Sequence, residues 1–140
     1  MWGVAAVVVL VLIILGAWWY GGSSRVPQGM PAFAPSGQLA NGFPKELILD
    51  SLASVSQSYN INYSTTTNQY TAQFNSSSSV ADLYNEYLTY LPAHGWPVTN
   101  NVTKYKNLRG LYAENASSVV SVAIVVQGAG SQATVTYLIK

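Results

Sequence analysis

The stretch Val80–Val98 reads VADLYNEYLTYLPAHGWPV and decides the fold, because it predicts the one amphipathic helix of the C-terminal part of the chain. Its apolar side chains recur three and four residues apart, which places them on one face of a helix. These residues are Val80, Leu83, Tyr84, Tyr87, Leu88 and Leu91. The residues expected to face solvent are Asp82, Asn85, Glu86 and Thr89. One helix face should therefore pack on another element.

Both ends of this helix carry recognisable signals. Ser79 is the expected N-cap, and Asp82 lies three residues on, near the positive end of the helix dipole. Pro92 cannot donate a helical hydrogen bond, so the helix should end there or within the next turn. Gly95 suits the left-handed position after a helix. His94, the only histidine, then falls in the last turn, and we interpret HGW as a helix stop rather than a ligand site.

Strand patterns lie on both sides of this helix. Residues 55–61 and 70–74 alternate between apolar and polar side chains, and the polar segment 62–68 between them predicts a hairpin. Four more strands are expected after the helix, over Trp96–Val102, Leu108–Ala113, Val119–Val126 and Ala133–Ile139. Residues 119–126 are apolar on both faces except for Ser121, which is typical of a central strand. The order β-β-α-β-β-β-β predicts an α+β fold, an antiparallel sheet with the helix on one face.

The N-terminal segment has the composition of a membrane span. Residues 3–20 read GVAAVVVLVLIILGAWWY and carry no charge, and a helix of about 20 residues spans a bilayer. Aromatic side chains lie at the two ends of the run and are the expected membrane-interface residues, namely Trp2, Trp18, Trp19 and Tyr20. A cleaved signal peptide is the alternative. The missing basic residue before the run, its length and the bulky WWY favour an uncleaved transmembrane anchor over residues 1–20.

Residues 21–43 are expected to be a linker, because they are rich in Gly, Pro and Ser and show no helical or strand period. The folded domain should then begin near Phe43-Pro44 and occupy residues 44–140. A domain of this size can bury a core of its own.

Two signals bear on orientation and they disagree. Arg25, on the C-terminal side of the span, favours a cytoplasmic C-terminus under the positive-inside rule. Charged residues make up only 8% of the chain, which is typical of exported domains, and four N-x-S/T sequons occur. The candidate glycan acceptors are Asn62, Asn75, Asn101 and Asn115. We expect a single-pass protein of the cell membrane with its C-terminal domain outside the cytoplasm.

The sequence offers no catalytic, cofactor or metal motif, so the expectation is a protein that is not an enzyme. His94 is the only imidazole, no G-x-S-x-G elbow is present, and the five carboxylates are scattered. The chain has no cysteine, which excludes disulfides and thiolate ligands. A net charge of +1 argues against a nucleic-acid partner. Ten Tyr and four Trp leave binding open, with Tyr63, Tyr90 and Tyr105 as candidates for exposure.

A resemblance rests on two stretches. Phe43-Pro44-Lys45-Glu46-Leu47 precedes a hairpin, and the helix leads to Gly95-Trp96-Pro97-Val98. This arrangement resembles small membrane-anchored bacterial envelope domains of unassigned function, in which FP-x-x-L-P-L precedes a strand and a helix ends in Y-x-x-x-L and then GW-x-V. Ile48 departs from that pattern, where proline is common, and the lipid-attachment cysteine of many such domains is missing. The resemblance implies this architecture and no activity.

Two functions follow as hypotheses. The first is a membrane-anchored extracytoplasmic domain with a non-catalytic interaction or structural role in the cell envelope, whose partners are the lipid bilayer and other envelope proteins. The second is a subunit of a pilus-like or other surface filament, packed with copies of itself through the N-terminal apolar helix. The second draws on a weaker similarity to pilin-type subunits, although no prepilin cleavage site precedes the run.

Overall fold

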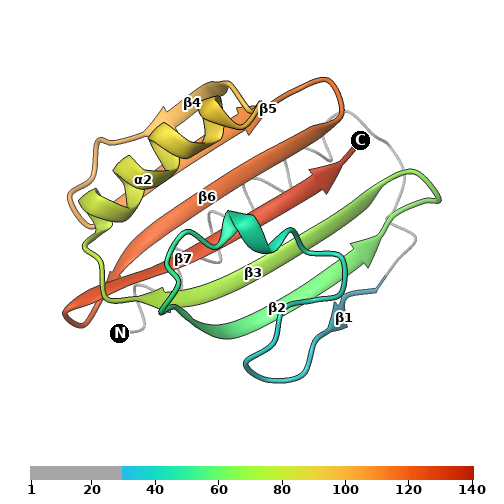
Figure 1. The fold of residues 1–140 in the computed structure, drawn as a ribbon, viewed down its shortest axis with the longest axis horizontal. Coiled ribbons are helices and arrows are strands. Elements are labelled where there is room, and N and C mark those ends of the chain that lie inside the picture. The colour runs from blue at the N-terminus through green and yellow to red at the C-terminus, as the bar shows by residue number, and fades with distance from the viewer. Residues whose placement is uncertain (1–29) are drawn as a thin grey trace.

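The computed structural model describes residues 30–140, which form an α+β fold (Figure 1). A seven-stranded antiparallel sheet has the order β1-β2-β3-β7-β6-β5-β4. The strands are β1 (Ala32–Phe33), β2 (Ser54–Asn62), β3 (Asn68–Ser76), β4 (Val98–Val102), β5 (Leu108–Glu114), β6 (Ser118–Gln127) and β7 (Gly130–Ile139). The helical elements are the 3-10 helix η1 (Lys45–Leu47) and the α-helix α2 (Val80–Ala93).

The six strands predicted from the sequence are all present, and β6 lies inside the sheet between β5 and β7, as its apolar faces predicted. The meander β4-β5-β6-β7 returns the chain to β3, so the last strand pairs with the first hairpin. Sequence alternation predicts which residues are strands, but this pairing of distant segments follows only from the assembled sheet.

A seventh strand, β1, lies in the range expected to be linker. Its two residues pair with Asn60 and Tyr59 of β2. The chain remains attached beyond β1, because the Ala40 N–H donates to the Ser58 hydroxyl at 2.8 Å and Phe43 is buried. Ordered contacts therefore begin before Phe43. Periodicity could not reveal them, because a two-residue strand has no period.

Helix α2 begins as predicted. The Ser79 hydroxyl accepts a hydrogen bond from the Asp82 N–H at 3.1 Å, which is the expected N-cap contact. The predicted inward residues are buried, except that Leu88 is half-buried, while Asp82, Asn85, Glu86 and Thr89 are exposed. The predicted amphipathic helix is confirmed.

The end of α2 shows the predicted helix stop and corrects one strand boundary. Gly95 has φ of +91°, and the Trp96 N–H donates to the Leu91 carbonyl at 2.9 Å, which closes the helix as a Schellman motif. Trp96 was expected to begin the next strand, but its N–H is used by the helix and Pro97 has none. β4 therefore starts at Val98. The Trp96 ring still packs on the sheet, edge-on to Tyr137.

The core lies between α2 and one face of the sheet, which we call the front face. Its strand side chains include Phe74, Ile124 and Val135, all fully buried. Helix α2 contacts β4, β5 and β6, so it covers only half of this face. The segment around η1 lies over β3 and β7 and covers the rest, with Leu47 fully buried (Figure 1). The predicted helix on one face of the sheet is confirmed, and the η1 segment completes the cover of that face.

Candidate functional site

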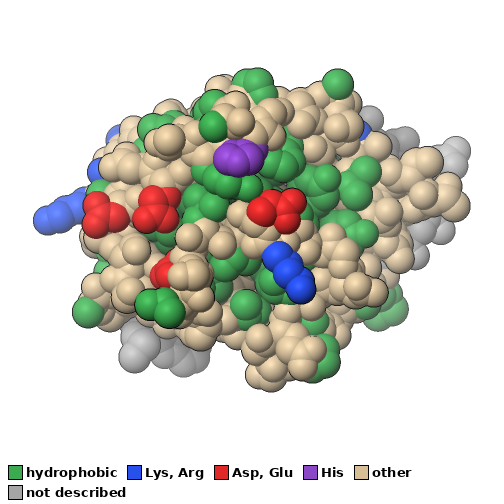
Figure 2. All heavy atoms as spheres, in the orientation of Figure 1, with side chains coloured by type: hydrophobic (Ala, Val, Ile, Leu, Met, Phe, Trp, Pro, Cys, Tyr) green, Lys and Arg blue, Asp and Glu red, His purple; other side chains and the backbone are tan. Residues whose placement is uncertain are grey.

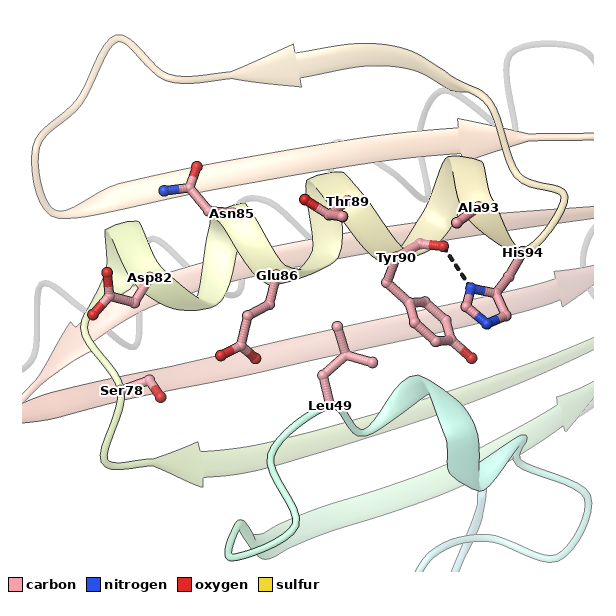
Figure 3. A pocket seen from close by; sticks show the side chains of 9 residues that line it. All are labelled: Leu49, Ser78, Asp82, Asn85, Glu86, Thr89, Tyr90, Ala93 and His94. Carbon is pink, nitrogen blue, oxygen red and sulfur yellow. Dashed lines mark hydrogen bonds between the residues drawn. The ribbon is translucent and has the colours of Figure 1, made fainter.

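An open groove of about 800 Å³ runs along α2, on the side that faces the η1 segment. We call it the α2 groove. It is lined by Leu49, Ser78, Asp82, Asn85, Glu86, Thr89, Tyr90, Ala93 and His94 (Figure 3). Seven of these residues come from α2 or its cap, because the solvent-facing stripe of an amphipathic helix meets the neighbouring loop along one edge. Figure 2 shows acidic side chains on both sides of the histidine on this face.

Tyr90 and His94 form one wall of the α2 groove. Their rings stack at 3.8 Å between centroids and 18° between planes. His94 Nδ1 lies 2.8 Å from the Tyr90 carbonyl oxygen, so Nδ1 carries a proton and donates to this end of the helix (Figure 3). Partial burial, and then the Glu46 carboxylate, raise the pKa of Tyr90. The phenol is therefore a neutral hydroxyl at ordinary pH, and the pair presents an aromatic surface beside carboxylates.

The ring of His94 has its two nitrogens in different settings. Nδ1 donates to the Tyr90 carbonyl of the same helix, which fixes the orientation of the ring, and in the neutral ring Nε2 is the acceptor nitrogen. Within residues 30–140, no group of three or more histidine or carboxylate side chains lies close enough to hold a metal ion. The groove offers the face of an aromatic ring and a few exposed hydrogen-bonding groups. Sequence reasoning missed Leu49 and Ser78, because loop residues that complete a groove have no periodic signal.

The opposite face of the sheet is the second surface of interest, and we call it the back face. Successive strand residues alternate between faces, so the neighbours of the core residues point here. The register places Ala123 beside Thr134 and Ser121 beside Thr136. The back face is made of Thr71, Gln73, Val119, Ser121, Ala123, Val125, Gln132, Thr134, Thr136 and Leu138. Its centre combines small, hydroxyl and aliphatic side chains.

Hydrogen bonds tie much of the back face together across the strands. Gln69 Nε2 lies 3.2 Å from the Thr71 hydroxyl, which lies 3.4 Å from the Thr136 hydroxyl. Gln73 Nε2 donates to the Gln132 side-chain oxygen at 3.2 Å. Thr134 stands apart, since its hydroxyl is buried and has no hydrogen-bond partner among residues 30–140. A buried hydroxyl without a partner costs free energy.

The four sequon asparagines lie in different surroundings. Asn62 is exposed at the end of β2. The Asn75 side-chain oxygen accepts from Gln132, and Asn101 Nδ2 donates to the Tyr84 hydroxyl. Both polar atoms of the Asn115 side chain form hydrogen bonds. Nδ2 donates to the Gly95 carbonyl, and Oδ1 accepts from Ser117 and Ser118. A glycan attaches at Nδ2, which Asn101 and Asn115 use as a hydrogen-bond donor, and of the two remaining asparagines Asn62 is the exposed one.

The three tyrosines named as candidates for exposure also differ in how far they are exposed. Tyr105 is 53% exposed, whereas Tyr63 and Tyr90 are half-buried. The predicted membrane-interface residues Trp2, Trp18, Trp19 and Tyr20, and the anchor itself, lie outside the described residues. Among residues 30–140, the structure contains no helix with the length and apolar composition of a membrane span.

Comparison with known protein families, curated protein sequences and solved structures finds no match to this chain.

Proposed function

We propose that this chain is a single-pass protein of the cell membrane that displays a non-catalytic interaction or structural domain outside the cytoplasm. The observation that carries the proposal is the uncharged 18-residue run over residues 3–20, bordered by aromatic side chains. The low charge of the rest of the chain supports an extracytoplasmic setting. The α2 groove, with Tyr90 and His94, is the surface that would contact another envelope component.

Extraction at alkaline pH tests the anchor. Val8→Arg with Leu12→Arg places two charges in the apolar run, and each costs about 2.5–3.5 kcal/mol at the centre of a membrane helix. The matched control, Met30→Arg with Leu52→Arg, places the same charges on side chains that are 87% exposed. The wild type and the control should stay in the membrane pellet in sodium carbonate, and the first variant should leave it. Release of the wild type would overturn the anchor.

Orientation has its own experiment. In a microsomal translocation assay, an exported domain should acquire N-linked glycan, and Asn62→Gln should remove one glycan mass because Asn62 is exposed. Asn60→Gln changes a nearby asparagine that is not in a sequon, and it should leave the glycan pattern unaltered. A wild-type chain without glycan, with its domain digested by protease added to sealed microsomes, would show that the domain is cytoplasmic.

A second candidate function is a subunit of a surface filament, and the back face favours it. A sheet face with a centre of small side chains, in the same chain as an apolar run, is a surface that an apolar helix of another subunit could cover. Electron microscopy of native membranes separates the two functions. Long polymers that disappear with Ala123→Arg on the back face would support the filament, and single particles in detergent would support the lone anchor.

A further inference from the structure

The back face is buried although the described helical elements lie on the other side of the sheet. Ala123 is 4% exposed, and Val125 and Thr134 are each 3% exposed. Helix α2 and η1 both lie over the front face (Figure 1). Strands β6 and β7 therefore carry a protected surface whose cover is not among the helices of residues 30–140. The unpartnered Thr134 hydroxyl lies at the centre of this surface.

The shape of the back face suits a helix. Ala123, Ser121 and Thr134 are small, so a rod can approach the middle of the sheet closely, while Val119, Val125 and Leu138 supply apolar contact along its length. Strands β6 and β7 have ten residues each, or about 33 Å. The 18-residue run over residues 3–20 would form a helix of about 27 Å. The lengths of surface and helix match.

The connection is long enough to deliver that run to the back face. The described chain enters the sheet at β1, which lies at its edge, three strand positions from β7. Three spacings of about 4.8 Å make a distance of about 14 Å. Residues 21–31 can extend about 36 Å at about 3.3 Å per residue. A tether of this length also gives an effective concentration in the millimolar range, which favours the chain's own segment over one from another molecule.

We propose that the back face is a docking site for the chain's own residues 3–20, which lie as a helix across β6 and β7 whenever they are outside the bilayer. The proposal goes beyond membrane anchoring, because one segment cannot occupy the sheet and the bilayer at the same time. It gives the domain a second role, which is to cover its own apolar segment in water until a membrane accepts it.

Disulfide trapping in the full-length chain tests the docking, because the native chain has no cysteine. A cysteine is placed on the back face, as Thr134→Cys or as the half-buried Thr136→Cys, and a second is placed in turn at Val9, Leu10, Val11 or Leu12. Glu86→Cys, on the exposed side of α2, replaces the back-face cysteine in the matched control. After mild oxidation in detergent-free buffer, at least one pair per back-face cysteine should close within the monomer at least about tenfold faster than the control pairs.

Two results would overturn the docking proposal. One is disulfide formation at equal rates with the back-face cysteines and with Glu86→Cys, which would mean that the segment has no preferred binding site on the domain. The other is a product that is only a covalent dimer, which would mean that a second copy supplies the helix. The carbonate experiment is independent of both. A chain that fails the trapping test but stays in the membrane pellet refutes the docking alone, and a chain that traps but does not pellet refutes the anchor alone.

Discussion

The Tyr87 hydroxyl on α2 donates a hydrogen bond of 2.6 Å to the main-chain carbonyl of Leu47, at the end of η1. Both residues are fully buried, and burial raises the pKa of Tyr87 far above its ordinary value. This contact joins the two segments that share the cover of the front face. It also positions one side of the α2 groove, because Leu49, two residues after Leu47, lines the groove.

Removal of the Tyr87 hydroxyl should weaken the contact between α2 and η1. Tyr87→Phe keeps the ring but leaves the Leu47 carbonyl buried without its donor, so we expect a loss of about 1–3 kcal/mol in the free energy of unfolding. Tyr90→Phe is the control, since Tyr90 is half-buried and its stacking on His94 needs only the ring. Urea denaturation of the two variants measures the difference. Equal losses would show that the hydrogen bond to Leu47 contributes nothing specific.

Acid sensitivity should depend on Asp50. The Ser76 hydroxyl donates to Asp50 Oδ2 at 2.5 Å and the Leu52 N–H to Oδ1 at 2.9 Å, and together they lower the pKa of this carboxyl. Because the folded pKa lies below the unfolded value of about 3.9, the stabilisation is complete above that value and is lost as pH falls through the folded pKa. Asp50→Asn should flatten the dependence of unfolding free energy on pH below about pH 5. Ser76→Ala should do so partly, and an unchanged profile in both variants would contradict this assignment.

The N-cap of α2 gives a prediction with a control of opposite sign. Ser79→Ala removes the acceptor for the Asp82 N–H and should cost about 1 kcal/mol of stability. Thr89→Ala changes an exposed residue in the helix interior, where alanine is the better helix former, and should gain a few tenths of a kcal/mol. Thermal unfolding followed by circular dichroism compares the two, and similar shifts would remove the case for a cap at Ser79.

The helix and the strands were predictable because their signals are local. The stripe from Val80 to Leu91 and its terminators specify α2 almost to the residue, and alternation specifies the strands around it. Two features of the fold were not predictable in this way. Strand β1 has two residues and exists only because β2 presents a free edge. Trp96 does not begin the next strand, because its N–H donates to the Leu91 carbonyl and closes the helix.

The surfaces were less predictable than the fold, because they arise between distant segments. The α2 groove needs Leu49 opposite Tyr90, which no spacing in the sequence relates. The back face was partly foreseeable, since the apolar run 119–126 implied that both faces of β6 meet other groups. The pairing of β7 with both β6 and β3 then gathers Thr71 and Thr134 beside it, and that pairing of distant strands has no sequence signal.

Among the glycines of residues 30–140, Gly130 should be the least tolerant of substitution. A Cβ there would lie 2.1 Å from the Ser76 carbonyl oxygen, so β3 and β7 would have to separate at that end. Gly130→Ala should cost about 3 kcal/mol or more, at the upper end of overpacking. Gly95→Ala meets no atom within 4 Å but must adopt φ of +91°, and it should cost only about 1–2 kcal/mol. Urea denaturation should rank the two, and the reverse order would mean that β7 has room to move.

Replacement of two threonines at the centre of the back face by valine should change the stability of the fold in opposite directions. Thr134→Val removes a buried hydroxyl that has no partner among residues 30–140 and keeps the shape of the side chain, so it should stabilise the fold by about 1 kcal/mol. Thr71→Val removes a hydroxyl that lies within hydrogen-bond distance of Gln69 Nε2 and the Thr136 hydroxyl, and it should destabilise by a similar amount. Urea denaturation of the full-length variants measures both. If Thr134→Val destabilises as much as Thr71→Val, then the Thr134 hydroxyl has a partner in solution, and the helix that covers it cannot be wholly apolar at that point.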